Sequence, residues 1–172
     1  MDNSLKKIID EESFKRIERH GRDILDSKEF KRSLGQVHHH KTTVGLHSIR
    51  TAMIGLWIID RLKKSGIKVD ERKVVRITLL HDLGMLGRKK RYKNDFECGY
   101  MHPRNSADTA RKIWKDIDIV SIKAIKSHMW PLSLNVPTSK EAFVLCLADK
   151  LASYKDITFK GEEALKGEQI RL

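Results

Sequence analysis

A histidine and an aspartate stand side by side within an apolar stretch of this chain, Ile77-Thr78-Leu79-Leu80-His81-Asp82-Leu83-Gly84. A helix with this pattern turns toward a core, so both ionisable side chains are expected to be buried. A buried carboxylate is costly unless it is paired or bound to a cation. The pair therefore favours a metal ion or a set of hydrogen-bond donors inside the fold.

Four more residues of metal-ligand type flank the pair: His47 before it, and His102, His128 and Asp149 after it. A single histidine on an apolar helical face is more often a hydrogen-bonded core residue. The ordered set is less easily explained that way, because each step along it is about one helical hairpin long and helices of a bundle can converge on one polar centre. Imidazole and carboxylate ligands suit Fe, Mn, Ni, Co and Zn without any cysteine.

Asp149 strengthens this interpretation because its helical neighbours are apolar or small. On a helix, residues three and four positions away share its face, and here they are Leu145, Cys146, Ala152 and Ser153. The carboxylate is therefore expected to be buried, and it needs a cation or several donors.

The elements that must position these residues are helices. Apolar residues recur at spacings of three and four, prolines number three, and no long alternating pattern is present. We expect an all-α fold: one compact domain over 1–172, a bundle of six to eight helices with a core near 38–155, N-terminal helices within 4–35 and a frayed tail at 160–172.

Several helix ends carry recognisable signals. Thr42 or Thr43 is expected to cap a helix that runs to Lys64 and stops at Gly66, and Asp70 one that continues through the His-Asp pair. The predicted starts further along the chain are Asp118 as a cap, Pro103 at the first helical position, and the capping box Thr138-Ser139-Lys140-Glu141.

The bulk properties narrow the class of protein. The formal net charge is +12, which favours anionic partners without choosing among nucleotides, other phosphate esters, nucleic acid and a membrane surface. Residues 1–30 are charged throughout, the longest apolar stretch is Met53 to Ile59, and Cys98 and Cys146 fit no zinc spacing. We therefore expect a cytoplasmic protein without a membrane partner.

Five basic or histidine-containing features have two interpretations each. The run that begins at Arg88, together with Arg104 and Lys126, either contacts an anion or is solvated. Lys150 either neutralises a substrate phosphate or extends into solvent. The run His38-His39-His40 is either an exposed loop or lies behind the ligands near His47.

The order His47, His81-Asp82, His102, His128, Asp149 resembles that of the HD-domain superfamily, and most closely its small stand-alone bacterial members. Supporting stretches are Leu80 to Gly84, His102-Pro103, His128 to Leu132 and Leu147 to Lys150. The resemblance covers about residues 38–155.

This resemblance implies an all-α metal-dependent phosphohydrolase that cleaves a phosphate mono- or diester, such as a nucleotide. It implies a first divalent metal on His47, His81, Asp82 and Asp149, and a second on Asp82, His102 and His128. The metals would polarise the phosphoryl oxygens and generate a bridging hydroxide. Asp82, His81 and Lys150 become the expected catalytic residues, with Lys150, Arg104, Lys126 and Arg88 around the substrate.

Two departures separate the chain from relatives that cleave cyclic dinucleotides. Met85 stands where those proteins usually have a lysine, and Ser127-His128-Met129 replaces a His-His-Glu run. Both differences argue against a cyclic-dinucleotide substrate.

Two other functions remain open. The same ligand order resembles that of mixed-valent di-iron oxygenases, a minority of the superfamily. A basic helical domain of this kind is also compatible with a non-catalytic module that binds nucleotides or nucleic acid, although neither a helix-turn-helix spacing nor interleaved aromatic and basic residues favour nucleic acid. The sequence predicts neither the substrate nor the oligomeric state.

Overall fold

The computed structural model describes residues 11–38 and 42–158, and these form eight α-helices, one short 3-10 helix and no strand beyond an isolated bridge between Val37 and Thr43. The all-α expectation is confirmed. The elements are α1 (Glu11–Leu25), α2 (Lys28–Ser33), α3 (Val44–Lys64), α4 (Glu71–Leu80), η2 (Leu83–Met85), α5 (Arg88–Arg91), α6 (Asp95–Ile113), α7 (Ile119–Ser127) and α8 (Lys140–Thr158).

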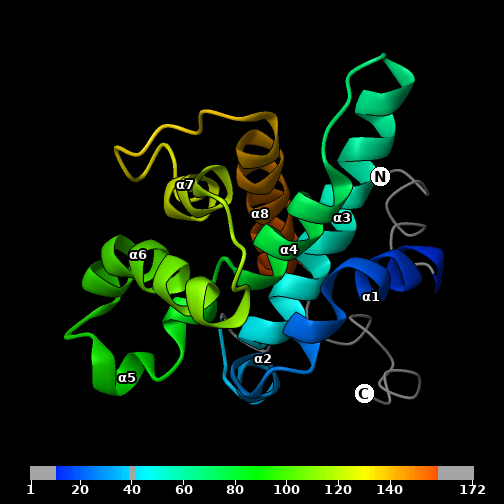
Figure 1. Ribbon diagram of the computed structural model, residues 1–172. Helices are drawn as coiled ribbons and strands as arrows, with labels where there is room; N and C mark the ends of the chain where they lie inside the picture. The colour runs from blue at the N-terminus through cyan, green and yellow to red at the C-terminus, as the bar shows by residue number, and fades with distance from the viewer. Residues whose placement is uncertain (1–10, 39–41, 159–172) are drawn as a thin grey trace.

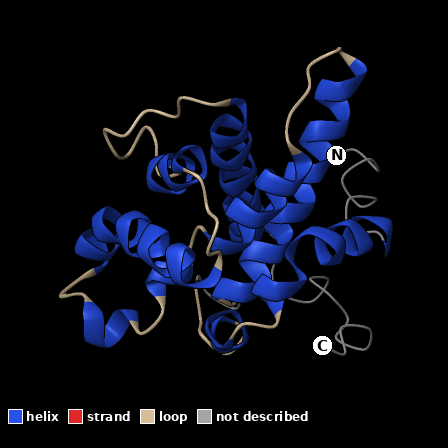
Figure 2. Ribbon diagram, viewed as in Figure 1, coloured by secondary structure: helices blue, strands red, loops and turns tan. Residues whose placement is uncertain are grey.

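The long helix α3 forms the axis of the bundle, with α4 and α8 packed along it (Figure 1). Helix α1 covers α4, while α7 packs on α8 and α6. Helix α6 also lies against η2, the short turn that follows the His-Asp pair. Helices and connecting loops account for all of the described chain (Figure 2). Residues of five helices can therefore approach one point between α3, α4, α6, α7 and α8.

Three of the predicted helix caps are present. Thr43 Oγ1 accepts from the Leu46 N–H, Asp70 Oδ1 from the Lys73 N–H and Asp118 Oδ1 from the Ser121 N–H, at 3.2, 3.0 and 2.7 Å. Such a side chain satisfies one of the unpaired donors in the first turn. These caps fix the starts of α3, α4 and α7, the helices that carry three of the predicted ligands.

The start expected at Pro103 is wrong. Helix α6 begins at Asp95, after the Asn94 cap, and Pro103 lies inside it. The Asn94 side chain accepts from the Glu97 N–H at 2.8 Å, and packing against η2 and α7 holds the helix despite the donor that proline lacks. His102 therefore projects from the middle of a helix.

Two smaller expectations are also corrected. Helix α4 ends at Leu80 and does not continue through the pair. The predicted capping box is a simple cap: Ser139 Oγ accepts from the Ala142 N–H, and Glu141 accepts from the Asp70 N–H at the neighbouring helix start. Of the predicted N-terminal helices, residues 4–10 lie outside the described residues, as does the tail 160–172.

Two ion-pair clusters hold α1 on the bundle. Both terminal nitrogens of Arg76 donate to the carboxylate of Asp23 at 2.7 Å, and the Arg76 guanidinium stacks on Trp114. Arg16 donates to Asp60 and Glu71. Among the described residues no helix is long and apolar enough to cross a membrane.

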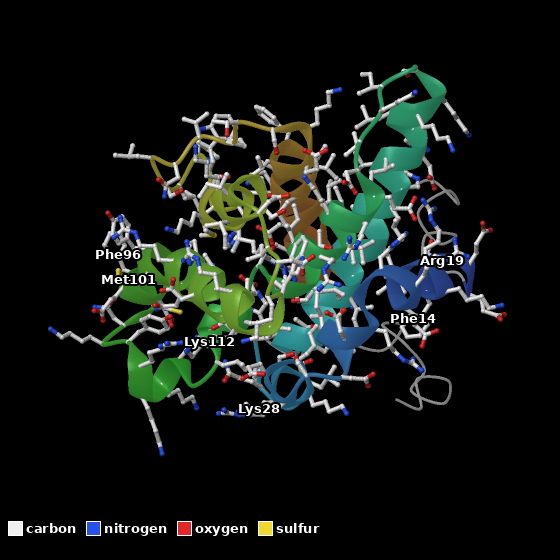
Figure 3. The ribbon with its side chains drawn as sticks, viewed as in Figure 1. Phe14, Arg19, Lys28, Phe96, Met101 and Lys112 are labelled. Carbon is white, nitrogen blue, oxygen red and sulfur yellow. The ribbon has the colours of Figure 1, made fainter. Side chains whose placement is uncertain are left out.

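Much of the positive charge stands on the outside of the bundle. Arg19, Lys28 and Lys112 are exposed and project from different elements (Figure 3).

Candidate metal centre

The structure brings all six predicted ligands together. His47 lies in the first turn of α3, His81 and His128 cap the carboxyl ends of α4 and α7, His102 lies within α6 and Asp149 within α8. Asp82 occupies the turn between α4 and η2. All six are buried. Burial of this many ionisable groups at one point requires a strong compensating interaction.

Asp82 lies at the centre of the cluster, and its two carboxylate oxygens face different histidines. Oδ2 lies 3.8 Å from His47 Nε2 and 3.4 Å from His81 Nε2. Oδ1 lies 3.2 Å from His102 Nε2 and 3.5 Å from His128 Nε2. The carboxylate thus divides the cluster into an Oδ2 side and an Oδ1 side.

Asp149 completes the Oδ2 side. Its Oδ1 lies 3.0 Å from His47 Nε2 and 3.5 Å from His81 Nε2. Ligand atoms of His47, His81 and Asp149 all lie within 4.8 Å of one another, as do those of His81, Asp82 and His128. Distances of this size are those between ligands that share one cation of the first transition series.

The histidine rings are oriented by the backbone. His81 Nδ1, His102 Nδ1 and His128 Nδ1 lie 2.7, 2.9 and 2.7 Å from the carbonyls of Thr78, Cys98 and Ile125. A ring nitrogen that faces a carbonyl carries the proton, so in the neutral imidazole each Nε2 presents a lone pair. Outer hydrogen bonds of this kind orient the histidines of metal sites.

The surroundings of all three Nε2 lone pairs are those that a cation would explain. His81 Nε2 is buried and has no hydrogen-bond partner. His102 Nε2 and His128 Nε2 approach to 2.9 Å, although the Nδ1 contacts leave both without a proton to share. Two facing lone pairs repel each other unless a cation lies between them. The donor set therefore fits divalent metals.

The charges of the cluster also favour metal binding. Burial raises the pKa of Asp82, but His81, His102 and His128 outweigh it and hold that pKa well below the usual range. Burial also raises the pKa of Asp149, but the neighbouring His47 and His81 outweigh it and hold that pKa well below the usual range. Burial lowers the pKa of His128. Ionised carboxylates and a neutral imidazole are the forms that ligate metals.

The end of α4 explains how neighbouring residues reach one centre. Adjacent side chains on a helix diverge by about 100°, but the helix stops at Leu80 and Asp82 has left helical geometry. The following turn is pressed onto α6: a Cβ on Gly84 would lie 2.3 Å from His102 O. The Gly84 N–H donates to Ser106 Oγ at 2.8 Å, and its carbonyl accepts from Tyr92 Oη at 2.7 Å.

A seventh residue, His38, joins the cluster. Its side chain is buried, and Nε2 lies 3.1 Å from Asp82 Oδ2. Of the two interpretations of His38-His39-His40, exposure is wrong for His38, while His39 and His40 lie outside the described residues. Three consecutive histidines were the only sequence signal for a ligand here. No helical periodicity links them to His47, so the spacing did not predict that His38 reaches the centre.

The predicted basic residues lie at varied distances from the centre. Lys150 Nζ donates to His128 O at 3.4 Å and to Cys146 O at 3.3 Å, which places the ammonium beside the Oδ1 side. Arg88 donates to His38 O. Arg104 is exposed above Tyr100, and Lys126 is half-buried in α7. The structure brings Lys150 and Arg88 to the ligand-bearing segments and leaves Arg104 on the surface.

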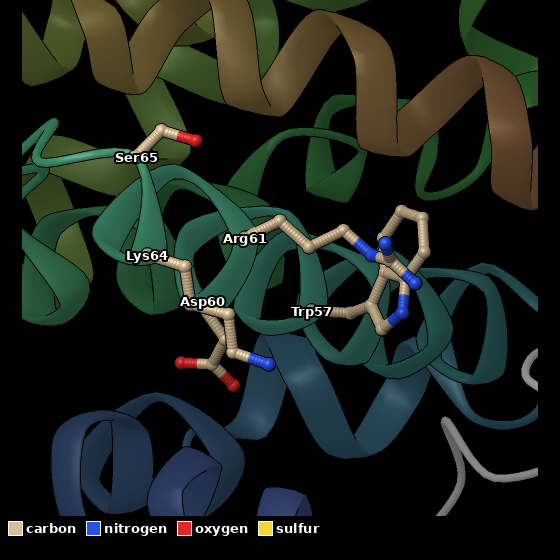
Figure 4. Close-up of a pocket in the computed structure, with 5 residues that line it drawn as sticks. All are labelled: Trp57, Asp60, Arg61, Lys64 and Ser65. Carbon is tan, nitrogen blue, oxygen red and sulfur yellow. The ribbon is translucent and has the colours of Figure 1, made fainter.

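A separate hollow of about 520 Å³ lies along the distal half of α3, away from the end that carries His47 (Figure 4). Its lining comes from one helix and its end: Trp57, Asp60, Arg61, Lys64 and Ser65. The Arg61 guanidinium stacks 4.1 Å from the Trp57 ring centroid. None of the predicted metal ligands lines this hollow.

Comparison with known families gives one finding. The family model described as HD domain matches residues 44–154, a segment that contains all six predicted ligands and most of the chain. No curated protein and no solved structure matches.

Proposed function

The chain belongs to the HD domain family, whose members are generally metal-dependent hydrolases, and from that premise we propose that it hydrolyses a phosphate mono- or diester with two divalent metal ions. The observation that carries the proposal is the position of Asp82, whose two carboxylate oxygens face different pairs of histidines. A carboxylate in this position is suited to bridging two cations.

In this proposal His47, His81, Asp82 and Asp149 hold the first ion, and Asp82, His102 and His128 the second. The ions, when bound, supply positive charge that polarises the phosphoryl group and lowers the pKa of a water molecule. In the overall reaction a water oxygen bonds to phosphorus, the ester P–O bond breaks, and a proton from the water passes to the leaving oxygen. A monoester then gives an alcohol and inorganic phosphate, and a diester gives an alcohol and a phosphate monoester.

The protein's own residues contribute positioning and charge. His81 is held by Thr78 O with its Nε2 toward the centre, so no reorientation is needed when a cation binds. Lys150 carries its ammonium to the edge of the centre. There it is suited to bind a phosphoryl oxygen and to balance the negative charge that grows in the transition state.

The substrate class follows from charge. The net charge of +12 attracts anions and raises their local concentration, and two cations in a buried centre require an anionic partner. We therefore propose a small phosphorylated metabolite, with a nucleotide as the first candidate. Arg104 and Lys126 are proposed as more distant contacts to its remaining groups.

The test uses metal-free protein reloaded separately with Mn²⁺, Co²⁺, Fe²⁺, Ni²⁺ or Zn²⁺. Nucleoside monophosphates, p-nitrophenyl phosphate and bis(p-nitrophenyl) phosphate serve as substrates. We expect metal-dependent hydrolysis that falls at least about 100-fold in Asp82→Asn, since even outer partners of metal ligands are worth 10–100-fold. His20→Gln, a histidine of α1 that pairs with Glu71, is the matched control and should retain activity.

Two results would replace the proposal with one of its alternatives. Substrate-dependent O₂ uptake by iron-loaded protein without phosphate release indicates an oxygenase. Salt-sensitive nucleic-acid binding that survives chelation, without turnover of any ester, indicates a binding module.

A further inference from the structure

His38 approaches the centre on a segment that belongs to no helix. It lies just after the bridge between Val37 and Thr43, and its N–H donates to Thr42 O at 2.8 Å. These contacts close the segment onto the start of α3, the helix that carries His47. The side chain is 5% exposed, so it faces the protein interior although its backbone belongs to a connecting segment.

The imidazole of His38 is aimed at the Oδ2 side of Asp82. Its Nε2 lies 3.1 Å from Asp82 Oδ2, closer than the corresponding nitrogens of His47 and His81. The His38 and His47 rings pack edge to face with centroids 4.6 Å apart. Ligand atoms of His38, His47 and Asp82 all lie within 4.8 Å of one another.

We propose that His38 is a fifth protein ligand of the first metal, together with His47, His81, Asp82 and Asp149. A tetrahedral zinc site is satisfied by four donors. Five nitrogen and oxygen donors instead suit a six-coordinate ion with one position left for water or substrate. The first metal position should therefore prefer ions that readily take six ligands, namely Mn²⁺, Fe²⁺, Co²⁺ or Ni²⁺, over tetrahedral Zn²⁺. This proposal rests on the metal centre and does not require hydrolysis.

Arg88 is the residue that holds His38 in place. Its Nη1 donates to His38 O at 3.2 Å, and its Nη2 pairs with Asp95 Oδ1 at 3.0 Å. The guanidinium thus ties the His38 segment to the start of α6. We assign Arg88 as a positioning residue that acts through His38, in place of the substrate contact expected from its basic character.

The experiment isolates the first metal in a His128→Ala background, which removes a donor of the second position. Co²⁺ is titrated into metal-free protein while its visible absorption is recorded, because fewer ligands give a more intense spectrum. Adding His38→Ala should weaken Co²⁺ binding at least about 10-fold and intensify the spectrum. Imidazole in the buffer should restore both properties, since it can occupy the space left by the side chain.

His20→Ala in the same background is the control and should change neither property. Arg88→Ala should weaken Co²⁺ binding less than His38→Ala does and should lose this effect once His38 is absent. Thermal unfolding with chelator present checks that each variant remains folded.

Unchanged affinity and an unchanged spectrum in His38→Ala would overturn the proposal. Weaker binding with no spectral change and no recovery in imidazole would also overturn it, because His38 would then act only by hydrogen bonding to Asp82. Failure of the His128→Ala background itself to bind Co²⁺ would refute this proposal, because no separate first metal position would then exist. A His38 effect without any ester hydrolysis would uphold the ligand and reject only the proposed reaction.

Discussion

The two sides of Asp82 differ in charge and in the elements that build them. The Oδ2 side includes a second carboxylate, Asp149, and comes from the packed helices α3, α4 and α8. The Oδ1 side has two histidines from α6 and α7 and no other acidic ligand. A site with more negative charge on better packed elements binds a cation more tightly. We therefore expect the first metal to be retained when the second is lost.

The largest predicted effect is on metal binding at the Oδ2 side, which we expect to bind its metal more tightly. Asp149→Ala removes its second carboxylate, and binding of the first Mn²⁺ or Co²⁺ should weaken at least about 100-fold. Isothermal titration of metal-free protein measures this directly. Equal affinities in the variant and the unmodified chain would show that the two sides do not differ in the way proposed.

His128→Ala should weaken metal binding at the Oδ1 side alone. Loss of one nitrogen opposite Asp82 Oδ1 should reduce the bound metal from about two ions to about one and leave the affinity of the remaining ion nearly unchanged. Elemental analysis after gel filtration gives the count. Loss of both ions together would mean that the two sides form a single, inseparable site.

Gly84→Ala tests the packing that supports the Oδ1 side. The added Cβ would lie 2.3 Å from His102 O and 2.5 Å from Ser106 N, both backbone atoms of α6. Separation of η2 from α6 should cost about 2–3 kcal/mol of unfolding free energy and displace His102 from Asp82. Urea unfolding of metal-free protein measures the cost. Gly99→Ala, at a position in α6 where an added Cβ meets nothing within 4 Å, is the control.

The smallest predicted effect lies far from both sides, at Asp23. A hydrogen bond from Arg76 lowers the pKa of the Asp23 carboxyl against the effect of burial. A lowered folded-state pKa stabilises the fold above the unfolded value of about 4 and loses that stabilisation as pH falls below it. Asp23 is 57% exposed, so Asp23→Asn should cost less than about 1 kcal/mol at pH 7.

The pH dependence separates this effect from the metal centre. Urea unfolding of chelated protein at pH 7 and pH 3 should show that Asp23→Asn costs more at pH 7. A larger cost at pH 3 would contradict the sign of the argument.

The sequence predicted the starts of those helices that are capped by a nearby side chain. Thr43, Asp70 and Asp118 cap their helices as expected because a cap depends on residues within one turn. Pro103 misled because tertiary packing and the Asn94 cap outweigh the local preference of proline for a helix start. A helix that is held on two neighbouring elements can absorb such a cost.

The six ligands were predictable because each interrupts an apolar helical face or ends one. His38 was not, since it lies in an irregular segment that is positioned by Thr42 and Arg88. The division of Asp82 into two sides was implied by family resemblance alone. Which oxygen faces which histidines depends on the turn after Leu80, and no sequence pattern encodes that orientation.

The most direct test of the central claim is the metal content of protein purified without air or chelator, compared with that of Asp82→Ala. If one carboxylate joins both sides, the unmodified chain should carry close to two ions and the variant close to none. Metal retained in full by Asp82→Ala, or absent from the unmodified chain under every condition, would contradict the account.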